Sequence, residues 1–116
     1  MLNIITRPFE SINGPNKVVK NLIKGLEKIN YPYVINKNLN YCNRIWVPNE
    51  LKIIPYLLNI NASIILGPNL FMTPRGLIPL RMRNDIIYLQ PSQWIVDWWT
   101  NQSEYKWYLK NIQFKA

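Results

Sequence analysis

Histidine is absent from this 116-residue sequence, and cysteine occurs only once. The lack of His removes the commonest metal ligand and general base, so zinc chemistry and Cys–His catalysis are not expected. The lone Cys42 excludes a disulfide within the chain and is expected to behave as a small hydrophobe. No apolar run approaches the ~20 residues that cross a bilayer, and the apolar opening is far too short for a signal peptide, so a cytoplasmic protein is expected.

Acidic residues are also scarce: Asp and Glu total 6 against 14 Lys and Arg, for a net charge of +8. Such an excess suggests an anionic partner, which could be a nucleotide diphosphate, a nucleic acid or an acidic membrane surface. Charge alone does not choose among them, and the abundance of Asn, Ile and Lys points partly to compositional bias. With 48% hydrophobic residues, the chain can bury one core and is too short for two domains, so residues 1–116 are expected to form one.

Short apolar runs that end in turn-type residues recur along the chain, which predicts buried strands at 2–6, 33–36, 44–47, 63–66 and 86–89. Their continuous hydrophobicity is typical of a parallel sheet covered on both faces. The segment 112–114 begins to resemble one further strand. The sheet is therefore expected to contain five or six strands.

Helices are predicted between these strands. The clearest covers 15–30, where an apolar stripe that runs from Val18 to Ile29 lies opposite four lysines. Asn49 can cap a second helix that reaches about residue 59, although Pro55 should make it begin late or kink. Residues 69–84 are expected to form a long loop with one short helical turn, and Ser92 to cap a third helix at 93–101. This order predicts an α/β, three-layer Rossmann-like domain with helices on both faces of a mostly parallel sheet.

Polar residues follow the predicted strands, and parallel strands bring their carboxyl ends to one edge. Pro48-Asn49, Pro68-Asn69 and Pro91-Ser92 share one design, in which a proline stops the strand and a small polar side chain follows. Each pair alone is a good turn; their joint placement predicts a polar binding edge. Asn13-Gly14-Pro15 would let a phosphate approach the backbone at a helix start, but an ordinary tight turn fits the same residues.

Four segments resemble the N-terminal domain of GT-B glycosyltransferases, above all the large retaining group called family 4-like: Gly14 to Leu26, Tyr31 to Val34, Gly67 to Asn69 and Tyr88 to Trp94. The resemblance extends from residue 1 to about 112. It implies hexosyltransferase-type transfer of a sugar from a nucleotide-sugar donor to a glycan or other acceptor, with no further cofactor and no metal. The donor-binding second domain of that family, with its paired glutamates, is missing from this sequence, so activity would require a second domain.

The same resemblance implies the roles of several residues. Asn13 and Gly14 would lie beside the donor diphosphate, although Asn13 stands where the family usually has a glycine. Asn49, Asn69, Gln90 and Ser92 would lie on the acceptor side. Glu10, Glu50 and Asp97 are the carboxylates nearest the predicted edge; Glu50 is expected to sit in the first turn of its helix, and no catalytic residue is assigned.

Other functions remain open. A remnant could bind a glycan or polar ligand without catalysis, and a basic nucleic-acid module is a weaker alternative. The C-terminal aromatic residues, from Trp94 to Tyr108, suggest contact with a partner domain or chain first, peripheral membrane contact second and nucleic acid last; core packing plus one apolar surface is the simpler interpretation. Arg75, Arg81 and Arg83 could clamp a phosphate, but a solvated basic loop is favoured.

Overall fold

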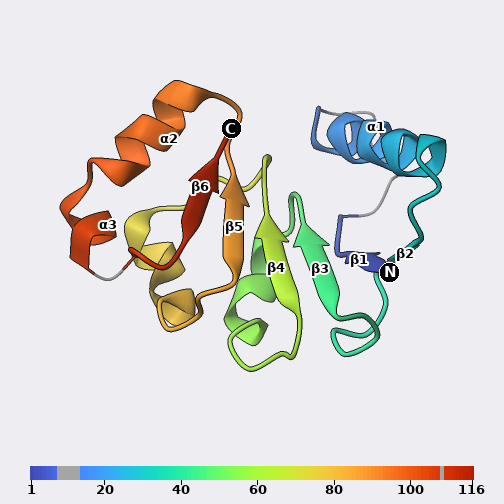
Figure 1. Cartoon of the computed structure of the whole chain (residues 1–116), viewed down its shortest axis with the longest axis horizontal. Helices are drawn as coiled ribbons and strands as arrows, with labels where there is room; N and C mark the ends of the chain where they lie inside the picture. The colour runs from blue at the N-terminus through green and yellow to red at the C-terminus, as the bar shows by residue number, and fades with distance from the viewer. Residues whose placement is uncertain (8–13, 108) are drawn as a thin grey trace.

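A computed structural model describes residues 1–7, 14–107 and 109–116 of the chain. Within these ranges lies a six-stranded sheet of order β2-β1-β3-β4-β5-β6, and every neighbouring pair is parallel (Figure 1). The strands are β1 (Leu2–Ile4), β2 (Tyr33–Ile35), β3 (Arg44–Val47), β4 (Ser63–Leu66), β5 (Ile86–Leu89) and β6 (Gln113–Lys115). The predicted α/β, Rossmann-like class is confirmed, and the tail segment supplies the sixth strand.

The order of the strands reverses once, between β1 and β3. From β1 the chain passes through helix α1 (Gly14–Lys28) to β2 on one side, whereas β3 pairs with the other side of β1 and the sheet then grows to β6. Right-handed crossovers in opposite directions place their connections on opposite faces of a sheet. The reversal therefore determines which face each helix covers.

Helix α1 covers the β1 and β3 part of one face. Its Val19 is fully buried against Leu2, Ile4 and Trp46. The lysines predicted for the outer side, at 17, 20, 24 and 28, are all exposed. The prediction was wrong for Ile29, which is 68% exposed because α1 ends at Lys28.

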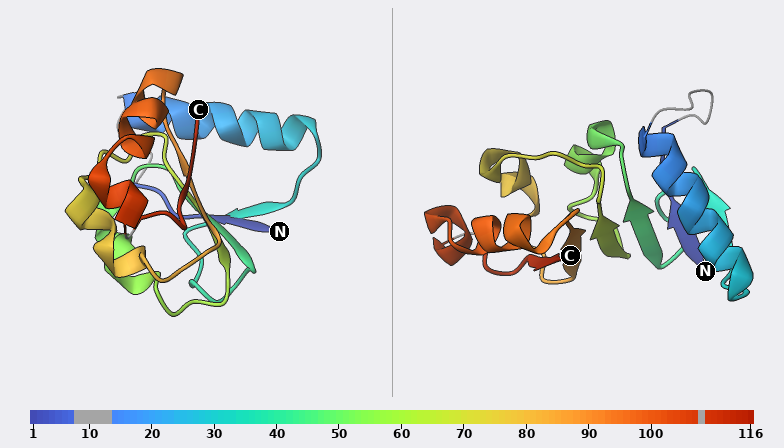
Figure 2. Two further views of the ribbon diagram at one scale, coloured as in Figure 1. Left: turned by 60° about the vertical axis from the view of Figure 1, so that its left-hand side comes forward. Right: turned by 90° about the horizontal axis from the view of Figure 1, so that it is seen from above.

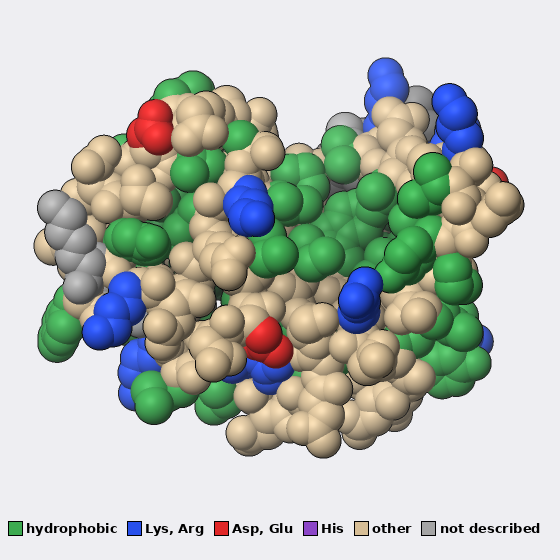
Figure 3. All heavy atoms as spheres, viewed as in Figure 1, with side chains coloured by type: hydrophobic (Ala, Val, Ile, Leu, Met, Phe, Trp, Pro, Cys, Tyr) green, Lys and Arg blue, Asp and Glu red, His purple; other side chains and the backbone are tan. Residues whose placement is uncertain are grey.

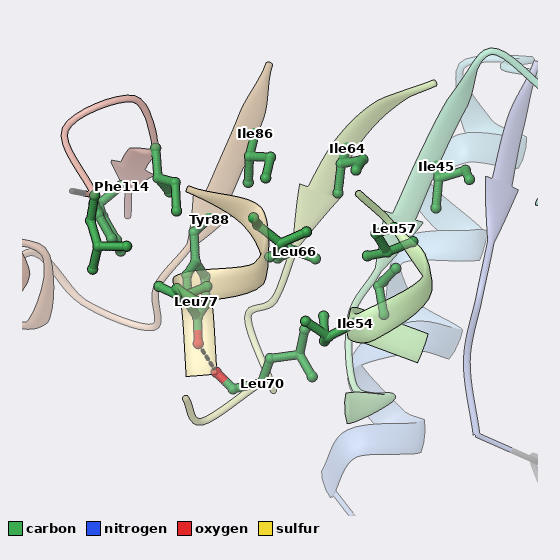
Figure 4. Packing of buried hydrophobic residues seen from close by; sticks show 14 of the residues in the cluster. Ile45, Ile54, Leu57, Ile64, Leu66, Leu70, Leu77, Ile86, Tyr88 and Phe114 are labelled. Carbon is green, nitrogen blue, oxygen red and sulfur yellow. Dashed lines mark hydrogen bonds between the residues drawn. The ribbon is translucent and has the colours of Figure 1, made fainter. Parts of the chain in front are cut away.

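The larger core lies on the opposite face. Ile45, Ile64 and Ile86 lie side by side in register across three strands, and the 3₁₀ helices η1 (Leu51–Tyr56) and η2 (Pro74–Leu80) cover them (Figure 4). Both 3₁₀ helices lie across the sheet from α1 (Figure 2). Helix α2 (Gln93–Thr100) adds Trp99, which stacks on Phe114 of β6 with ring centroids 4.9 Å apart.

Two predictions about these connections need correction, and one helix was not predicted. The second helix is a 3₁₀ helix rather than an α-helix, because Pro55 has no N–H to donate to an α-helical hydrogen bond. Its N-cap residue is Glu50, not Asn49. Residues 74–80 form a full 3₁₀ helix rather than one short turn. A further helix, α3 (Ser103–Trp107), follows α2 and was not predicted.

Part of the sheet face beside α1 has no helix over it in the described ranges. Ile87 and Leu89 of β5 point to this face and are only half-buried. Figure 3 shows hydrophobic side chains gathered in a hollow over the middle strands, next to α1. Among the described helices, none has the length and hydrophobicity to cross a membrane.

Candidate functional site

The carboxyl ends of all six strands meet at one edge of the sheet, the upper edge in Figure 1. We call this edge the rim and define it by its polar residues, which are Thr6, Asn36, Asn49, Asn69, Gln90 and Ser92. The predicted acceptor-side residues Asn49, Asn69, Gln90 and Ser92 are thus placed on one edge. In open α/β sheets this edge, near the point where strand order reverses, is where ligands bind.

Amide side chains hold the rim together at the reversal. Asn36, which has a φ of 53°, accepts a hydrogen bond from the Thr6 N–H at 2.8 Å and donates one to the Thr6 carbonyl at 3.1 Å. On the other side, Asn49 Oδ1 accepts hydrogen bonds from Thr6 Oγ1 and from the Arg7 N–H, both at 3.1 Å. The ends of β2, β1 and β3 are thereby fixed to one another.

Asn49 also carries an unused donor. Its side chain is only 1% exposed, and Nδ2 has no hydrogen-bond partner within the described part of the chain. A buried donor without a partner costs free energy, so such groups are rare in folded proteins. Asn49 Nδ2 is therefore placed to donate a hydrogen bond to an acceptor on a bound ligand.

The far side of the rim carries two more such groups. Gln90 is 7% exposed; its backbone N–H donates to the Lys115 carbonyl at 2.7 Å, while its Nε2 has no hydrogen-bond partner among the described residues. The buried Oγ of Ser92 is likewise unpaired in that set. Ser92 is the N-cap residue of α2, as predicted, although its side chain makes no capping hydrogen bond within the described residues.

Asn69 and Gly67 shape the middle of the rim. The Asn69 N–H donates to the Pro48 carbonyl at 2.9 Å, which ties the end of β4 to the end of β3, and its side chain is half-buried. Gly67 has a φ of +83°, and a Cβ there would lie 2.3 Å from the Leu89 carbonyl oxygen. Only glycine fits this close approach.

Two cavities open along this edge. One, of about 480 Å³, lies beside the ends of β1 and β2 and is lined by Ile5, residues 36–40, Ile53 and Ile60. The other, of about 160 Å³, lies beside the end of β5 and is lined mainly by aromatic side chains together with Gln90. Both ends of the rim are therefore hollowed.

The predicted donor-side residues are only partly described. Gly14 is the first residue of α1, whereas Asn13 and Glu10 lie outside the described residues. Glu50 accepts a hydrogen bond from the Lys52 N–H at 3.2 Å, and Asp97 from Gln93 Nε2 at 3.1 Å. These two carboxylates act locally, and neither is assigned a catalytic role.

Arg83 is neither a phosphate clamp nor a solvated loop residue. Its guanidinium pairs with Asp85 at 2.7 Å and donates hydrogen bonds to the carbonyls of Leu57, Leu58, Ile60 and Ala62. A planar guanidinium with five N–H donors suits this task, because it can bind several carbonyls at once. Arg83 therefore holds the loop between η1 and β4.

Sequence reasoning also missed Asn3 and Asn36. Asn3 is fully buried in β1; its Nδ2 donates to the carbonyls of Lys37 and Asn38, and its Oδ1 accepts from the Lys37 N–H. The detectable signal was a polar residue inside an apolar strand, since such a residue needs partners. Asn36 could have been suspected as an asparagine at a strand end, where positive φ is tolerated.

Comparison of the chain with protein-family models, with curated proteins and with solved structures found no match. The functional argument therefore rests on the rim itself. Within residues 1–7, 14–107 and 109–116, no cluster of His, Cys, Asp or Glu could hold a metal ion.

The C-terminal aromatic residues divide between core and surface. Trp99 is buried against Phe114 and Tyr88, whereas Trp94, Trp98 and Trp107 are exposed. This division fits the simpler of the two interpretations, core packing plus one apolar surface. Tyr108 lies outside the described residues.

Proposed function

We propose that this chain is the acceptor-binding half of a nucleotide-sugar-dependent glycosyltransferase, completed by a donor-binding domain. The observation that carries the proposal is the set of buried, unpaired donors on one rim, which are Asn49 Nδ2, Gln90 Nε2 and Ser92 Oγ. Each lowers the stability of the free protein, and each would gain a partner from an oxygen-rich ligand.

The chemistry of these groups suits a carbohydrate. Amides and hydroxyls are uncharged and directional, and a sugar presents uncharged hydroxyl oxygens that accept hydrogen bonds. Ligand sites typically combine a few such groups with aromatic walls, and the cavity beside Gln90 has both. The rim is thus better suited to a neutral glycan than to a polyanion such as nucleic acid.

The donor diphosphate would lie at the opposite end of the rim. Gly14 begins a 15-residue helix there, and a helix N-terminus attracts anions through its free N–H groups and dipole. Arg7, exposed at the end of β1, adds a positive charge. A second domain would supply the remaining contacts to the nucleotide.

Glycan binding without catalysis is the second candidate. It is favoured by the local engagement of Glu50 and Asp97, the described carboxylates nearest the rim. The two candidates make the same prediction for glycan binding and differ only in turnover.

Isothermal titration of glycans and sugar nucleotides tests the proposal, with the chain alone and mixed with candidate donor-binding domains. Asn49→Asp keeps the Oδ1 acceptor for Thr6 and Arg7 but removes the Nδ2 donor, so it should fold and lose glycan affinity. Asn61→Ala, at an exposed position, is the matched control. Sugar transfer in a mixture supports the transferase, and binding without transfer supports the second candidate. The absence of binding in every combination, or wild-type glycan affinity in Asn49→Asp, would refute the proposal.

A further inference from the structure

The smaller cavity on the rim is walled by aromatic rings. We call it the aromatic cavity; its volume is about 160 Å³, and its lining is Leu70, Phe71, Met72, Tyr88, Gln90, Ile95, Trp98 and Trp99. A space of roughly 150 Å³ holds one benzene-sized ring. The aromatic cavity can therefore admit a single six-membered ring, and none of its described lining residues is charged.

Its floor is buried and held from several directions. The Tyr88 hydroxyl donates to the Leu70 carbonyl, and the Tyr88 ring lies 5.9 Å from that of Trp99 (Figure 4 shows the Tyr88 bond). Trp99 in turn stacks on Phe114. A floor anchored to both β5 and β6 gives a site that does not have to be ordered when a ligand binds.

Its outer wall is open to solvent. Trp98 is 46% exposed and meets Trp99 edge-on, with ring centroids 5.2 Å apart and an interplanar angle of 84°. Phe71 is exposed on the η2 side of the same cavity. These rings offer flat apolar surface at the entrance, where a ligand would first make contact.

Gln90 provides the polar contact. Its side chain lines the cavity beside the Tyr88 hydroxyl, is more than nine-tenths buried, and makes no hydrogen bond through Nε2 in the described part of the chain. An apolar cavity with one unpaired donor selects a ligand that has both an apolar face and an acceptor oxygen.

We propose that the aromatic cavity binds one pyranose ring of a neutral glycan, with its C–H face against Trp98 and a ring or hydroxyl oxygen accepting from Gln90 Nε2. This inference rests on the proposed function and names the acceptor subsite within it. The ring hydrogens of a pyranose are slightly positive and suit the negative face of an indole. A nucleotide fits less well, because its phosphates would find no cation among the described lining residues.

The indole N–H signals of the tryptophans in a ¹H–¹⁵N spectrum test this directly. Methyl glycosides of glucose, galactose and N-acetylglucosamine, titrated to millimolar concentrations, should shift the signals of Trp98 and Trp99. Trp46 should not respond, because its buried indole donates to the Gly67 carbonyl away from this cavity. Uridine monophosphate serves as the nucleotide comparison and should shift them less, because its phosphate finds no cation among the described lining residues.

Two variants separate a binding role from a structural one. Gln90→Leu should weaken glycoside binding by about tenfold, the effect of one lost hydrogen bond, without lowering Tm, since it removes a buried unpaired donor. Gln93→Leu, on the exposed surface of α2, should leave affinity unchanged. Trp98→Ala should abolish binding, whereas Trp94→Ala, on the same helix but outside the lining, should not.

The outcomes distinguish this inference from the proposed function. One outcome is that glycans bind the rim with an affinity that falls in Asn49→Asp while the indole signals of Trp98 and Trp99 do not shift. In that case the proposed subsite is wrong and the proposed function stands. If uridine monophosphate shifts the two indole signals more than every glycoside does, the ligand class is wrong. Shifts of both indoles by a glycoside that disappear in Gln90→Leu would support the inference.

Discussion

Replacing Arg83 should be among the most damaging single changes in this chain. Its side chain is only 11% exposed and pairs with the Asp85 carboxylate. It also donates to four backbone carbonyls, three in part-buried hydrogen bonds and one in an exposed one. Arg83→Met keeps the apolar stem and removes every one of these bonds. The loop 57–62 would then have to rehydrate its carbonyls or move.

The magnitude follows from the contacts. A hydrogen bond to a charged group contributes roughly 1.5–3 kcal/mol, but the bonds of one guanidinium are not additive, and water can replace part of them. We expect Arg83→Met to lower the free energy of unfolding by about 3 kcal/mol. For a domain of this size that corresponds to a fall in Tm of roughly 12 °C.

Urea denaturation followed by tryptophan fluorescence and by far-UV circular dichroism measures this loss. Arg83→Lys should recover less than half of it, because an ammonium cannot reproduce the planar fork. Arg81→Met is the matched control, since among the described residues the Arg81 guanidinium donates only to the Ile78 carbonyl of its own turn. A urea midpoint for Arg83→Met within the error of the wild-type midpoint would show that the Arg83 hydrogen bonds do not stabilise the loop.

Two further predictions concern the rim. Gly67→Ala forces a Cβ to within 2.3 Å of the Leu89 carbonyl oxygen at a φ of +83°, so we expect a loss of about 2–3 kcal/mol in the same urea assay, against a small effect for Gly25→Ala in open space on α1. Burial raises the pKa of Tyr88 to about 12 from 10.0, so the stabilisation from its protonated form is present below pH 10.0 and is lost toward pH 12. The free energy of unfolding should therefore fall more between pH 9 and a pH above 11 in the wild type than in Tyr88→Phe. Equal falls in the two proteins would contradict the raised pKa of Tyr88.

Strand positions could be predicted because they depend on local hydrophobicity. The runs at 44–47, 63–66 and 86–89 coincide with β3, β4 and β5, and their unbroken apolar character correctly indicated parallel pairing. The ends of parallel strands must share an edge, so the joint placement of Asn49, Asn69, Gln90 and Ser92 followed from the same pattern.

What escaped prediction depends on contacts distant in sequence. Nothing local shows that Arg83 reaches back to Leu57, or that Asn3 holds Lys37 and Asn38. The prediction that Asn49 caps the second helix was wrong for a similar reason. The Asn49 side chain bonds to Thr6 on the neighbouring strand end, and Glu50 caps η1 instead. The aromatic residues gave no sign of which were core, because their burial depends on where β6 lies.

The position of β1 has one more consequence. In the described structure, β2 pairs only with β1, so its attachment to the rest of the sheet passes through that strand. Loss of β1, for example by proteolysis, would detach the second strand as well and leave Val19 of α1 with only Trp46 of the three buried residues in its cluster. The stability of the whole N-terminal third therefore depends on a strand of three residues.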